Sequence, residues 1–317
     1  MSILRTMLWE NFKDATSTTA TLLKIMIPVS IIVKIFEMTG AITIIGSYLA
    51  PVMQLTGLPG ETGLVWATAM ITNIYGGLLV FITLSSQMAF TVAQVTVLAT
   101  MILVAHSLPI EVTIARKAGV RVWFTLTMRI GCAFIFGVIL STLFGVTGLL
   151  TTESMMVWQP VQANTTILSW ILNQLRNYAM IYAIVFLLLL LLKILEHIGA
   201  IAKINKVFEP GLEKLGMSKE AGPLTIIGTT LGISYGGGLI IKEARSGRLK
   251  PKDAFLSVSL MGLSHSLIED TLLMMTLGAS LLGILLGRVV LTILTISIII
   301  RLINRLPKDA FQRFFYR

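Results

Sequence analysis

The sequence predicts an all-α polytopic membrane protein built from two inverted-topology repeats. The first observation behind this prediction is the composition, because 55% of the 317 residues are hydrophobic and only 13% are charged. A soluble domain carries about 25% charged residues, so this chain lacks the side chains to cover a water-facing surface. The second observation is a series of long apolar runs, and the third is a set of motifs that recurs along the chain.

Six apolar runs are long enough to cross a bilayer as helices. About 20 residues, each rising about 1.5 Å, span a hydrocarbon core of about 30 Å. Residues 1–17 have apolar side chains on one helical face and charged residues between them, which predicts an N-terminal interfacial helix. Residues 304–317 are expected to form a basic cytoplasmic tail. The expected crossings are residues 19–38, 88–110, 121–146, 178–198, 254–277 and 281–303.

Two further apolar runs, 62–84 and 221–241, are interrupted in the middle by Tyr-Gly-Gly. The arm before the glycines is about 15 residues, or about 22 Å of helix, which passes the midplane without crossing the bilayer. We therefore expect two re-entrant helical hairpins, each preceded by an interfacial helix at 41–60 or 200–220. Three crossings then remain in each half, and two inverted halves require an odd number.

The internal repeat is visible as motifs that match in one register. We expect membrane repeat one at 18–146 and membrane repeat two at 178–303, joined by an external linker at 147–177. The matching motifs, 159 residues apart or one residue more for Tyr-Gly-Gly, are "VKIFEMTGAI" at 33–42 and "LKILEHIGAI" at 192–201, "YGG" at 75–77 and 235–237, and "HSLPIE" at 106–111 and "HSLIED" at 265–270.

The distribution of lysine and arginine indicates that the two halves are inverted. Loop 116–121 is basic whereas its equivalent within 271–287 has no basic residue, and loop 242–252 is basic whereas its equivalent within 76–87 has none. Basic residues favour the cytoplasmic side, so equivalent loops are expected on opposite faces of the membrane. With both termini cytoplasmic, 19 of the 25 basic residues lie on the cytoplasmic side. The excess of basic residues is thus explained by their position on the cytoplasmic side of the lipid bilayer, and no nucleic-acid partner is expected.

The first candidate site is formed by the tips of the two hairpins. Non-helical backbone at membrane depth is tolerated only where it is buried in protein or lines a watery cavity. Glycine allows backbone amides and carbonyls to approach a ligand closely. A tight turn without a ligand is the alternative interpretation. The candidate solute-binding residues are Asn73, Tyr75, Gly76 and Gly77 in the first half and Ser234, Tyr235, Gly236 and Gly237 in the second.

The second candidate site is the pair of His-Ser-Leu motifs. Ionisable residues at membrane depth are costly and usually face a cavity or one another. A histidine followed four or five residues later by a carboxylate can carry a proton, bind a cation or hold a polar solute. The alternative is that each histidine only bonds a neighbouring helix. The candidates are His106, Ser107, His265 and Ser266 for the solute and Glu111, Glu269 and Asp270 for a coupling ion.

Three other features of the run 121–146 constrain the structure. Arg129 lies deep within it and is expected to need an internal acceptor. Small residues recur there every four positions, which favours close helix packing within one protomer or between the protomers of a homo-oligomer. Cys132 is the only cysteine, which excludes a disulfide framework and a cysteine zinc cluster.

The two His-Ser-Leu motifs, each preceded by a Tyr-Gly-Gly hairpin and an interfacial helix, resemble the Gate, or nucleoside-recognition, family of membrane proteins. The resemblance covers about residues 20–303. It extends to the core of concentrative nucleoside transporters, to spore-maturation membrane proteins and to the membrane part of bacterial ferrous-iron transporters. It implies two inverted repeats around a central site, in the cytoplasmic membrane of a bacterium or archaeon.

In the nucleoside transporters that are similar in plan, hairpin tips and broken helices hold the solute and a coupling sodium ion or proton. The chain departs from the iron transporters in lacking a GTPase domain and a cysteine at the hairpins, and it is shorter than a full nucleoside transporter. The counterparts that the resemblance implies are Asn73, Tyr75, Ser234, Tyr235, His106, Glu111, His265, Glu269 and Asp270.

The sequence therefore predicts a secondary active transporter, coupled to protons or sodium, for a small polar and nucleoside-like solute. A divalent-cation permease is the second hypothesis, and it requires that both histidines approach one point. A non-transporting scaffold or partner subunit is the third. No P-loop or nucleophile elbow occurs, and adjacent histidine and serine on one helix point about 100° apart, so no enzyme is expected. No cofactor or resident metal is expected beyond the coupling ion.

Overall fold

The computed structural model describes residues 2–157 and 166–317, and every regular element in these ranges is helical, as predicted. Isolated β-bridges join Thr91 to Glu153 and Val120 to Tyr316. The elements in chain order are α1 (Ser2–Met38), α2 (Ala41–Gln54), α3 (Thr62–Ile71), α4 (Ile74–Ser85), α5 (Val92–Val104), α6 (Leu108–Lys117), α7 (Val122–Thr147), α8 (Ile167–His197), α9 (Ala200–Lys214), α10 (Ala221–Leu231), α11 (Ile233–Arg245), α12 (Pro251–Leu263), α13 (Glu269–Met275), the π-helical turn η1 (Leu282–Gly287), α14 (Arg288–Asn304) and α15 (Lys308–Phe314).

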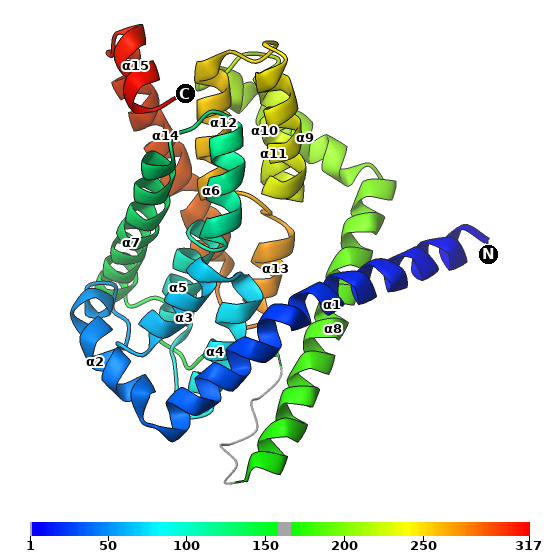
Figure 1. The fold of residues 1–317 in the computed structure, drawn as a ribbon, viewed down its shortest axis with the longest axis vertical. Helices are drawn as coiled ribbons and strands as arrows, with labels where there is room; N and C mark the ends of the chain where they lie inside the picture. The colour runs from blue at the N-terminus through cyan, green and yellow to red at the C-terminus, as the bar shows by residue number, and fades with distance from the viewer. Residues whose placement is uncertain (1, 158–165) are drawn as a thin grey trace.

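The order of helices in the first half recurs in the second (Figure 1). α2 begins at Ala41 and α9 at Ala200, a spacing equal to that between the two histidine motifs. Each half contains a long helix, a short helix, a helical pair joined by a tight turn, a broken helix and another long helix. The equivalent pairs are α1 and α8, α2 and α9, α3 and α10, α4 and α11, α5 and α12, α6 and α13, and α7 and η1–α14.

Five helical stretches within the described ranges are long and apolar enough to cross a membrane, so the chain is a multi-pass membrane protein. The sixth expected crossing, 254–277, is absent from these stretches, and like the expected crossing 88–110 it is not a single helix. α12 ends at Leu263 and α13 begins at Glu269, and the second histidine motif lies in the break between them. The five stretches are Arg5–Met38, Val92–Lys117, Val122–Thr147, Ile167–His197 and Leu282–Asn304.

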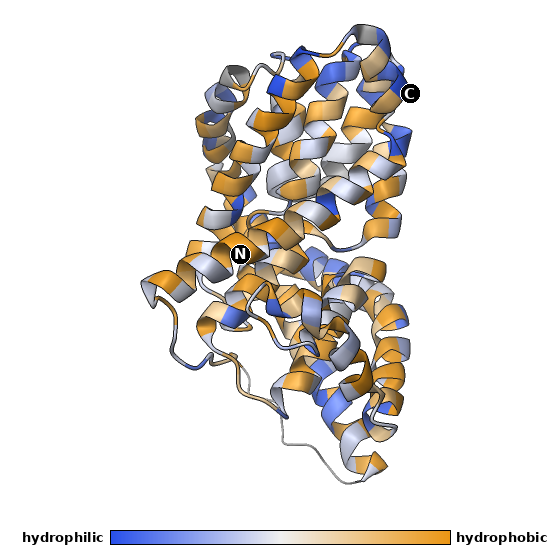
Figure 2. Cartoon of the chain, turned by 90° about the vertical axis from the view of Figure 1, so that its left-hand side faces the viewer, coloured by the Kyte–Doolittle hydropathy of each residue, from blue (hydrophilic) through white to orange (hydrophobic). Residues whose placement is uncertain are grey.

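The outward faces of the long helices are apolar. Ile135 and Leu143 on α7 and Leu294 and Ile298 on α14 are all exposed. Water-exposed faces of this kind are rare on soluble proteins, whereas lipid tails solvate them well. Figure 2 shows that hydrophobic residues cover the middle of the helices while hydrophilic residues gather toward their ends.

α1 is one continuous helix, so the expected boundary after residue 17 is not a helix break. The sequence between this point and Pro28 holds no glycine or proline that would end a helix. α1 packs along α8, where the Asn11 amide donates to the Phe186 carbonyl at 3.0 Å and the hydroxyls of Ser30 and Tyr178 lie 2.6 Å apart. The position of the first turns on the membrane surface stays a prediction.

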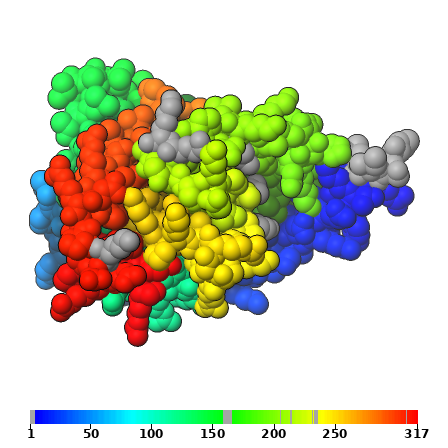
Figure 3. All heavy atoms as spheres, turned by 90° about the horizontal axis from the view of Figure 1, so that it is seen from above, coloured from blue at the N-terminus to red at the C-terminus, as the bar shows by residue number. Residues whose placement is uncertain are grey.

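Three basic segments meet at one end of the molecule. The Arg317 amide donates to the Gly119 carbonyl at 2.7 Å, and the Arg121 amide donates to the Phe315 carbonyl at 3.0 Å. The Lys252 ammonium donates to the side chain of Asn304. Figure 3 views this end and shows the C-terminal residues beside the segment that connects α11 to α12.

Three segments that lack this basic character meet at the opposite end. The Ser154 amide donates to the Phe90 carbonyl at 2.8 Å, and the Val157 amide donates to the Thr276 carbonyl at 2.9 Å. The loop after α6 and its equivalent after α13 therefore lie at opposite ends (Figure 1). The inverted topology of the two halves stays a prediction.

Candidate functional site

Both histidine motifs lie where a helix is broken. The break between α5 and α6 covers residues 105–107, and the break between α12 and α13 covers residues 264–268. Ser107 and Ser266 have φ angles of 48° and 46°, in the left-handed region that side chains other than glycine rarely adopt. This conformation costs free energy and persists only when the surroundings enforce it, which often occurs at functional sites.

The helical pairs hold these breaks in place through backbone hydrogen bonds. The Ser107 amide donates to the Ala69 carbonyl on α3, and the Leu267 amide donates to the Thr229 carbonyl on α10, both at 2.9 Å. Each break therefore satisfies part of its backbone against the first helix of its own hairpin.

The glycines of the Tyr-Gly-Gly motifs permit close helix packing. A Cβ on Gly77 would lie 2.8 Å from the Ala69 Cβ, and a Cβ on Gly236 would lie 2.3 Å from the Gly228 Cα. This contact supports the structural interpretation of those glycines. Gly76 donates its amide to the Asn73 side chain at 2.9 Å, which caps α4.

The other predicted residues of the hairpin tips divide into two groups. Tyr75 is buried, so its ring contributes to the protein interior. Gly237 is buried near the start of α11. The side chains of Ser234 and Tyr235 lie outside the described residues. A solute-binding role for the tips stays a prediction.

Two fully buried arginines terminate the helices that precede the breaks. The Arg129 Nε donates to the Val104 carbonyl at 2.9 Å, and the Arg288 Nε donates to the Leu263 carbonyl at 3.1 Å. The Arg288 Nη2 also donates to the His265 carbonyl at 2.7 Å. Carbonyls at the end of a helix lack intrahelical partners, and the guanidinium groups supply them. The expected internal acceptor of Arg129 is therefore found.

Arg288 is not among the site residues that the sequence predicts, although its position in the repeat distinguishes it. It occupies the position in the second half that Arg129 occupies in the first, at the spacing of the repeat. Arg288 lies inside the expected crossing 281–303 as Arg129 lies inside 121–146, and the match of two arginines at membrane depth is the signal that identifies it.

The two histidines meet at the centre of the molecule, with their Nε2 atoms 3.3 Å apart. The His106 Nδ1 lies 2.9 Å from the Ile102 carbonyl, and the His265 Nδ1 lies 2.8 Å from the Met261 carbonyl. A carbonyl oxygen only accepts, so both Nδ1 atoms are donors. The sequence could place each histidine on its helix but could not show that the two rings face each other.

Two carboxylates approach the histidine pair, and all four side chains are more than nine-tenths buried or close to it. The Glu111 Oε1 lies 3.6 Å from the His106 Nε2 and 3.5 Å from the His265 Nε2. The Glu111 Oε2 forms an ion pair with the Arg129 Nη1 at 2.6 Å. The Asp270 Oδ2 lies 4.0 Å from the His106 Nε2.

The structure thus brings together four of the predicted residues, His106, His265, Glu111 and Asp270, which we call the central cluster. Glu269, the third predicted carboxylate, is half-buried at the start of α13, and no described ion pair involves it. The hydroxyl of Ser266 is near the backbone of Gly232, where an added Cβ would lie 2.8 Å from it. A role for these residues in binding stays a prediction.

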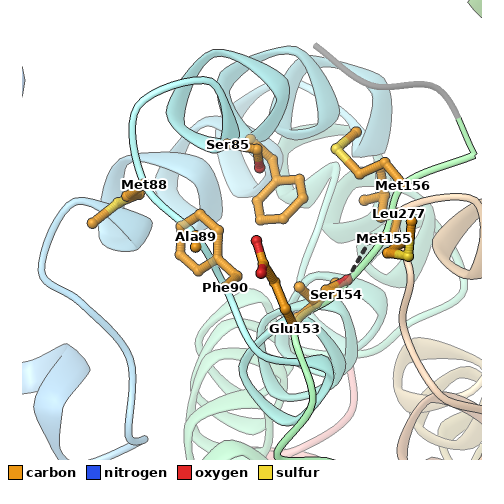
Figure 4. A pocket seen from close by; sticks show the side chains of 11 residues that line it. Ser85, Met88, Ala89, Phe90, Glu153, Ser154, Met155, Met156 and Leu277 are labelled. Carbon is orange, nitrogen blue, oxygen red and sulfur yellow. Dashed lines mark hydrogen bonds between the residues drawn. The ribbon is translucent and has the colours of Figure 1, made fainter.

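A separate cavity of about 120 Å³ lies at the end that carries Phe90 and Ser154. Figure 4 shows the Glu153 carboxylate directed into it and three methionines around it. Pockets for small organic ligands usually measure about 300–1,000 Å³, so this cavity is too small for a nucleoside-sized solute. None of its lining residues belongs to the central cluster.

Comparison with known proteins agrees with this architecture. Residues 179–284 match the family described as "Gate: Nucleoside recognition", so the predicted resemblance is confirmed for this segment. The second half of this membrane protein is therefore similar to the Gate family.

A relative with similar length is a protein of Bacillus subtilis (strain 168) described as "Uncharacterized membrane protein YvoD". It is 28% identical to this chain over 281 residues, which cover 87% of this chain and 88% of the relative. No solved structure matches the chain.

Proposed function

We propose that the protein is a secondary active transporter that works by alternating access and binds a cation at the central cluster. The observation that carries this proposal is the meeting of two broken helices, one from each half, at a buried group of histidines and carboxylates. Broken helices near the midplane, at the interface of two repeats, are where secondary transporters bind substrate and coupling ions.

The arrangement of the loops supports the inverted topology that such a mechanism uses. The basic loop after α6 contacts the C-terminal tail at one end, whereas the equivalent loop after α13 contacts the linker at the other end. By the positive-inside rule, the end with Gly119 and Arg317 is cytoplasmic, which also makes the C-terminus cytoplasmic. The Gate match is consistent with a transporter-related membrane protein.

The solute that we propose is small, polar and nucleoside-like. The Gate family description supports the nucleoside class, and the first helix of each hairpin is bonded to the break of its own half. Alternating access would proceed by movement of the hairpin and broken helix of each half against the long helices, as in transporters built on the same plan.

Alternating access can be tested with cysteine labelling from both sides of the membrane. The variant is Thr72→Cys, at the turn between α3 and α4, in a chain whose own cysteine is removed by Cys132→Ala. Thr72 is half-buried at the end of α3, the helix that is bonded to the break between α5 and α6, so an impermeant maleimide should label it in both inside-out and right-side-out vesicles.

Two exposed positions serve as controls for that labelling. Met155→Cys, at the end that carries the linker, should react from one side only, and Lys250→Cys should react only from the other. One-sided labelling of Thr72→Cys under all conditions would overturn the transporter proposal and favour the scaffold hypothesis.

The solute class needs its own experiment. A nucleoside that binds the folded protein should raise the thermal unfolding midpoint of the purified chain in detergent, because a ligand that binds only the native state stabilises it. Nucleobases and free ribose serve as matched controls. If a full nucleoside panel leaves the midpoint unchanged while Thr72→Cys labels from both sides, the solute class is wrong and the transport mechanism stands.

A further inference from the structure

We propose that the central cluster, His106, His265, Glu111 and Asp270, is a binding site for a divalent transition-metal ion. This inference rests on the proposed function, since it assigns a chemical class to the cation of the transporter. It differs from the sodium ion or proton of the leading sequence-based hypothesis and agrees in cation class with the second one, the divalent-cation permease.

The first argument concerns the electron pairs of the two imidazole rings. Each Nδ1 faces a backbone carbonyl and therefore carries a proton. In neutral imidazole the other nitrogen is then an acceptor, so both Nε2 atoms direct lone pairs into the same space, 3.3 Å apart. Two buried acceptors facing each other repel, and a cation between them turns this repulsion into attraction.

The second argument is the distance between the donor atoms. A tetrahedral ion with bonds of about 2.0–2.1 Å separates its ligand atoms by about 3.3–3.4 Å. The two Nε2 atoms lie 3.3 Å apart, and the Glu111 Oε1 lies 3.5 and 3.6 Å from them. These separations match the spacing of ligand atoms around one tetrahedral ion.

The fourth donor comes from the second half of the chain. The Asp270 Oδ2 lies 4.0 Å from the His106 Nε2. The donor atoms of His106, His265 and Asp270 all lie within 4.8 Å of one another. With the Glu111 Oε1, which lies near both Nε2 atoms, the proposed donor set holds two nitrogens and two oxygens.

The third argument is the support behind the donors. Histidines that bind metals usually donate their other ring N–H to a carbonyl or carboxylate, which fixes the tautomer and the ring orientation. Both histidines have this support, from Ile102 and Met261. The Glu111 Oε2 is held by Arg129 at 2.6 Å, which leaves the Oε1 directed at the histidines.

The donor types decide between classes of cation. Sodium, magnesium and calcium prefer oxygen ligands, whereas imidazole nitrogen suits zinc, iron, copper and nickel. The buried guanidinium groups of Arg129 and Arg288 lie near the carboxylates and oppose the binding of a further cation. This opposition weakens binding, as is required of an ion that must also leave.

Cobalt(II) is a suitable probe because tetrahedral coordination gives it an intense visible absorption band. The experiment adds Co²⁺ alone to the purified full-length chain in detergent and measures both the spectrum and the bound metal after dialysis. We expect one Co²⁺ per chain with a tetrahedral spectrum. His106→Ala and His265→Ala should each weaken binding at least tenfold, since each removes one of four ligands.

The third histidine of the chain is a matched control. His197, at the exposed end of α8, lies outside the cluster, so His197→Ala should bind Co²⁺ as the unchanged protein does. Glu111→Gln and Asp270→Asn are conservative variants that test the oxygen donors. Helix content by circular dichroism and the unfolding midpoint without metal show whether each variant is folded.

The proposal is overturned if the folded, unchanged chain binds no stoichiometric Co²⁺, or if binding survives both His106→Ala and His265→Ala. Failure of the metal site and failure of transport are distinguishable. Two-sided labelling of Thr72→Cys without Co²⁺ binding rejects only the metal, whereas Co²⁺ binding with one-sided labelling rejects only the transporter.

Discussion

The two halves of the molecule use one plan with different electrostatics at the centre. In the first half, Glu111 bridges both histidines and pairs with Arg129 at 2.6 Å. In the second half, Asp270 is one methylene shorter and forms no ion pair with Arg288 among the described residues. The comparison teaches that a repeated scaffold can present unequal charges to a shared site.

The break in the second half is also longer than that in the first. It covers 264–268, whereas the first covers 105–107, and Pro109 lies in the first turn of α6. Proline is well tolerated in the first turn of a helix and presets its backbone, so α6 resumes soon after the break. Because α13 resumes after a longer break than α6 does, Asp270 lies closer to the start of its helix than Glu111 does.

The largest expected effect comes from breaking the ion pair of the first half. Arg129→Leu leaves Glu111 as an uncompensated buried charge, which should lower the free energy of unfolding by about 3–5 kcal/mol. SDS-induced unfolding in mixed micelles measures this. The double variant Arg129→Leu with Glu111→Leu should be less destabilised than the single one. If the double variant loses as much stability as Arg129→Leu alone, the ion pair does not contribute to stability.

The equivalent change in the second half should cost less. Arg288→Leu removes two hydrogen bonds to carbonyls and no close ion pair, so we expect a loss of about 1.5–3 kcal/mol. The same unfolding measurement, carried out in parallel with Arg129→Leu, tests the asymmetry directly. A loss as large as that of Arg129→Leu would show that Arg288 and Asp270 are coupled as strongly as their counterparts.

A third prediction concerns the packing of the hairpins. Gly236→Ala places a methyl group against the backbone of Gly228, which should cost about 1–3 kcal/mol because backbone cannot move aside easily. Gly238→Ala is the matched control, since nothing lies within 4 Å of its added Cβ. The control should be neutral or stabilising by up to about 1 kcal/mol, as alanine is the better helix former. Equal effects of both variants on the unfolding midpoint would contradict the packing role.

The smallest expected effect separates the two hairpin turns. α4 is capped by the side chain of Asn73, whereas α11 begins after Gly232, which has no side chain to cap it. Asn73→Ala should therefore cost about 1 kcal/mol through the lost cap. Asn73→Ser retains an acceptor and should recover most of the stability. If Asn73→Ser does not recover stability, the Asn73 side chain has a role other than capping α4.

Periodicity and composition predicted most of the helices because long apolar runs leave few alternatives in a bilayer. The interruptions at the Tyr-Gly-Gly motifs predicted the turns between α3 and α4 and between α10 and α11. Hydrophobicity alone did not show that the run 254–277 breaks at His265, since the apolar residues on both sides of the short polar motif give the run the length of one crossing. It also did not distinguish glycine for ligand access from glycine for packing.

The sequence by itself determined that the chain is a helical membrane protein, that its motifs repeat and that histidines and carboxylates recur at matching positions. These properties are local or periodic, so they can be read from residue type and spacing. Only the tertiary structure decided that His106 and His265, 159 residues apart, face each other at 3.3 Å, and that Arg288 and Arg129 close the helices around them. Such contacts depend on how whole helices pack, and spacing along the chain does not encode the distance between two helices.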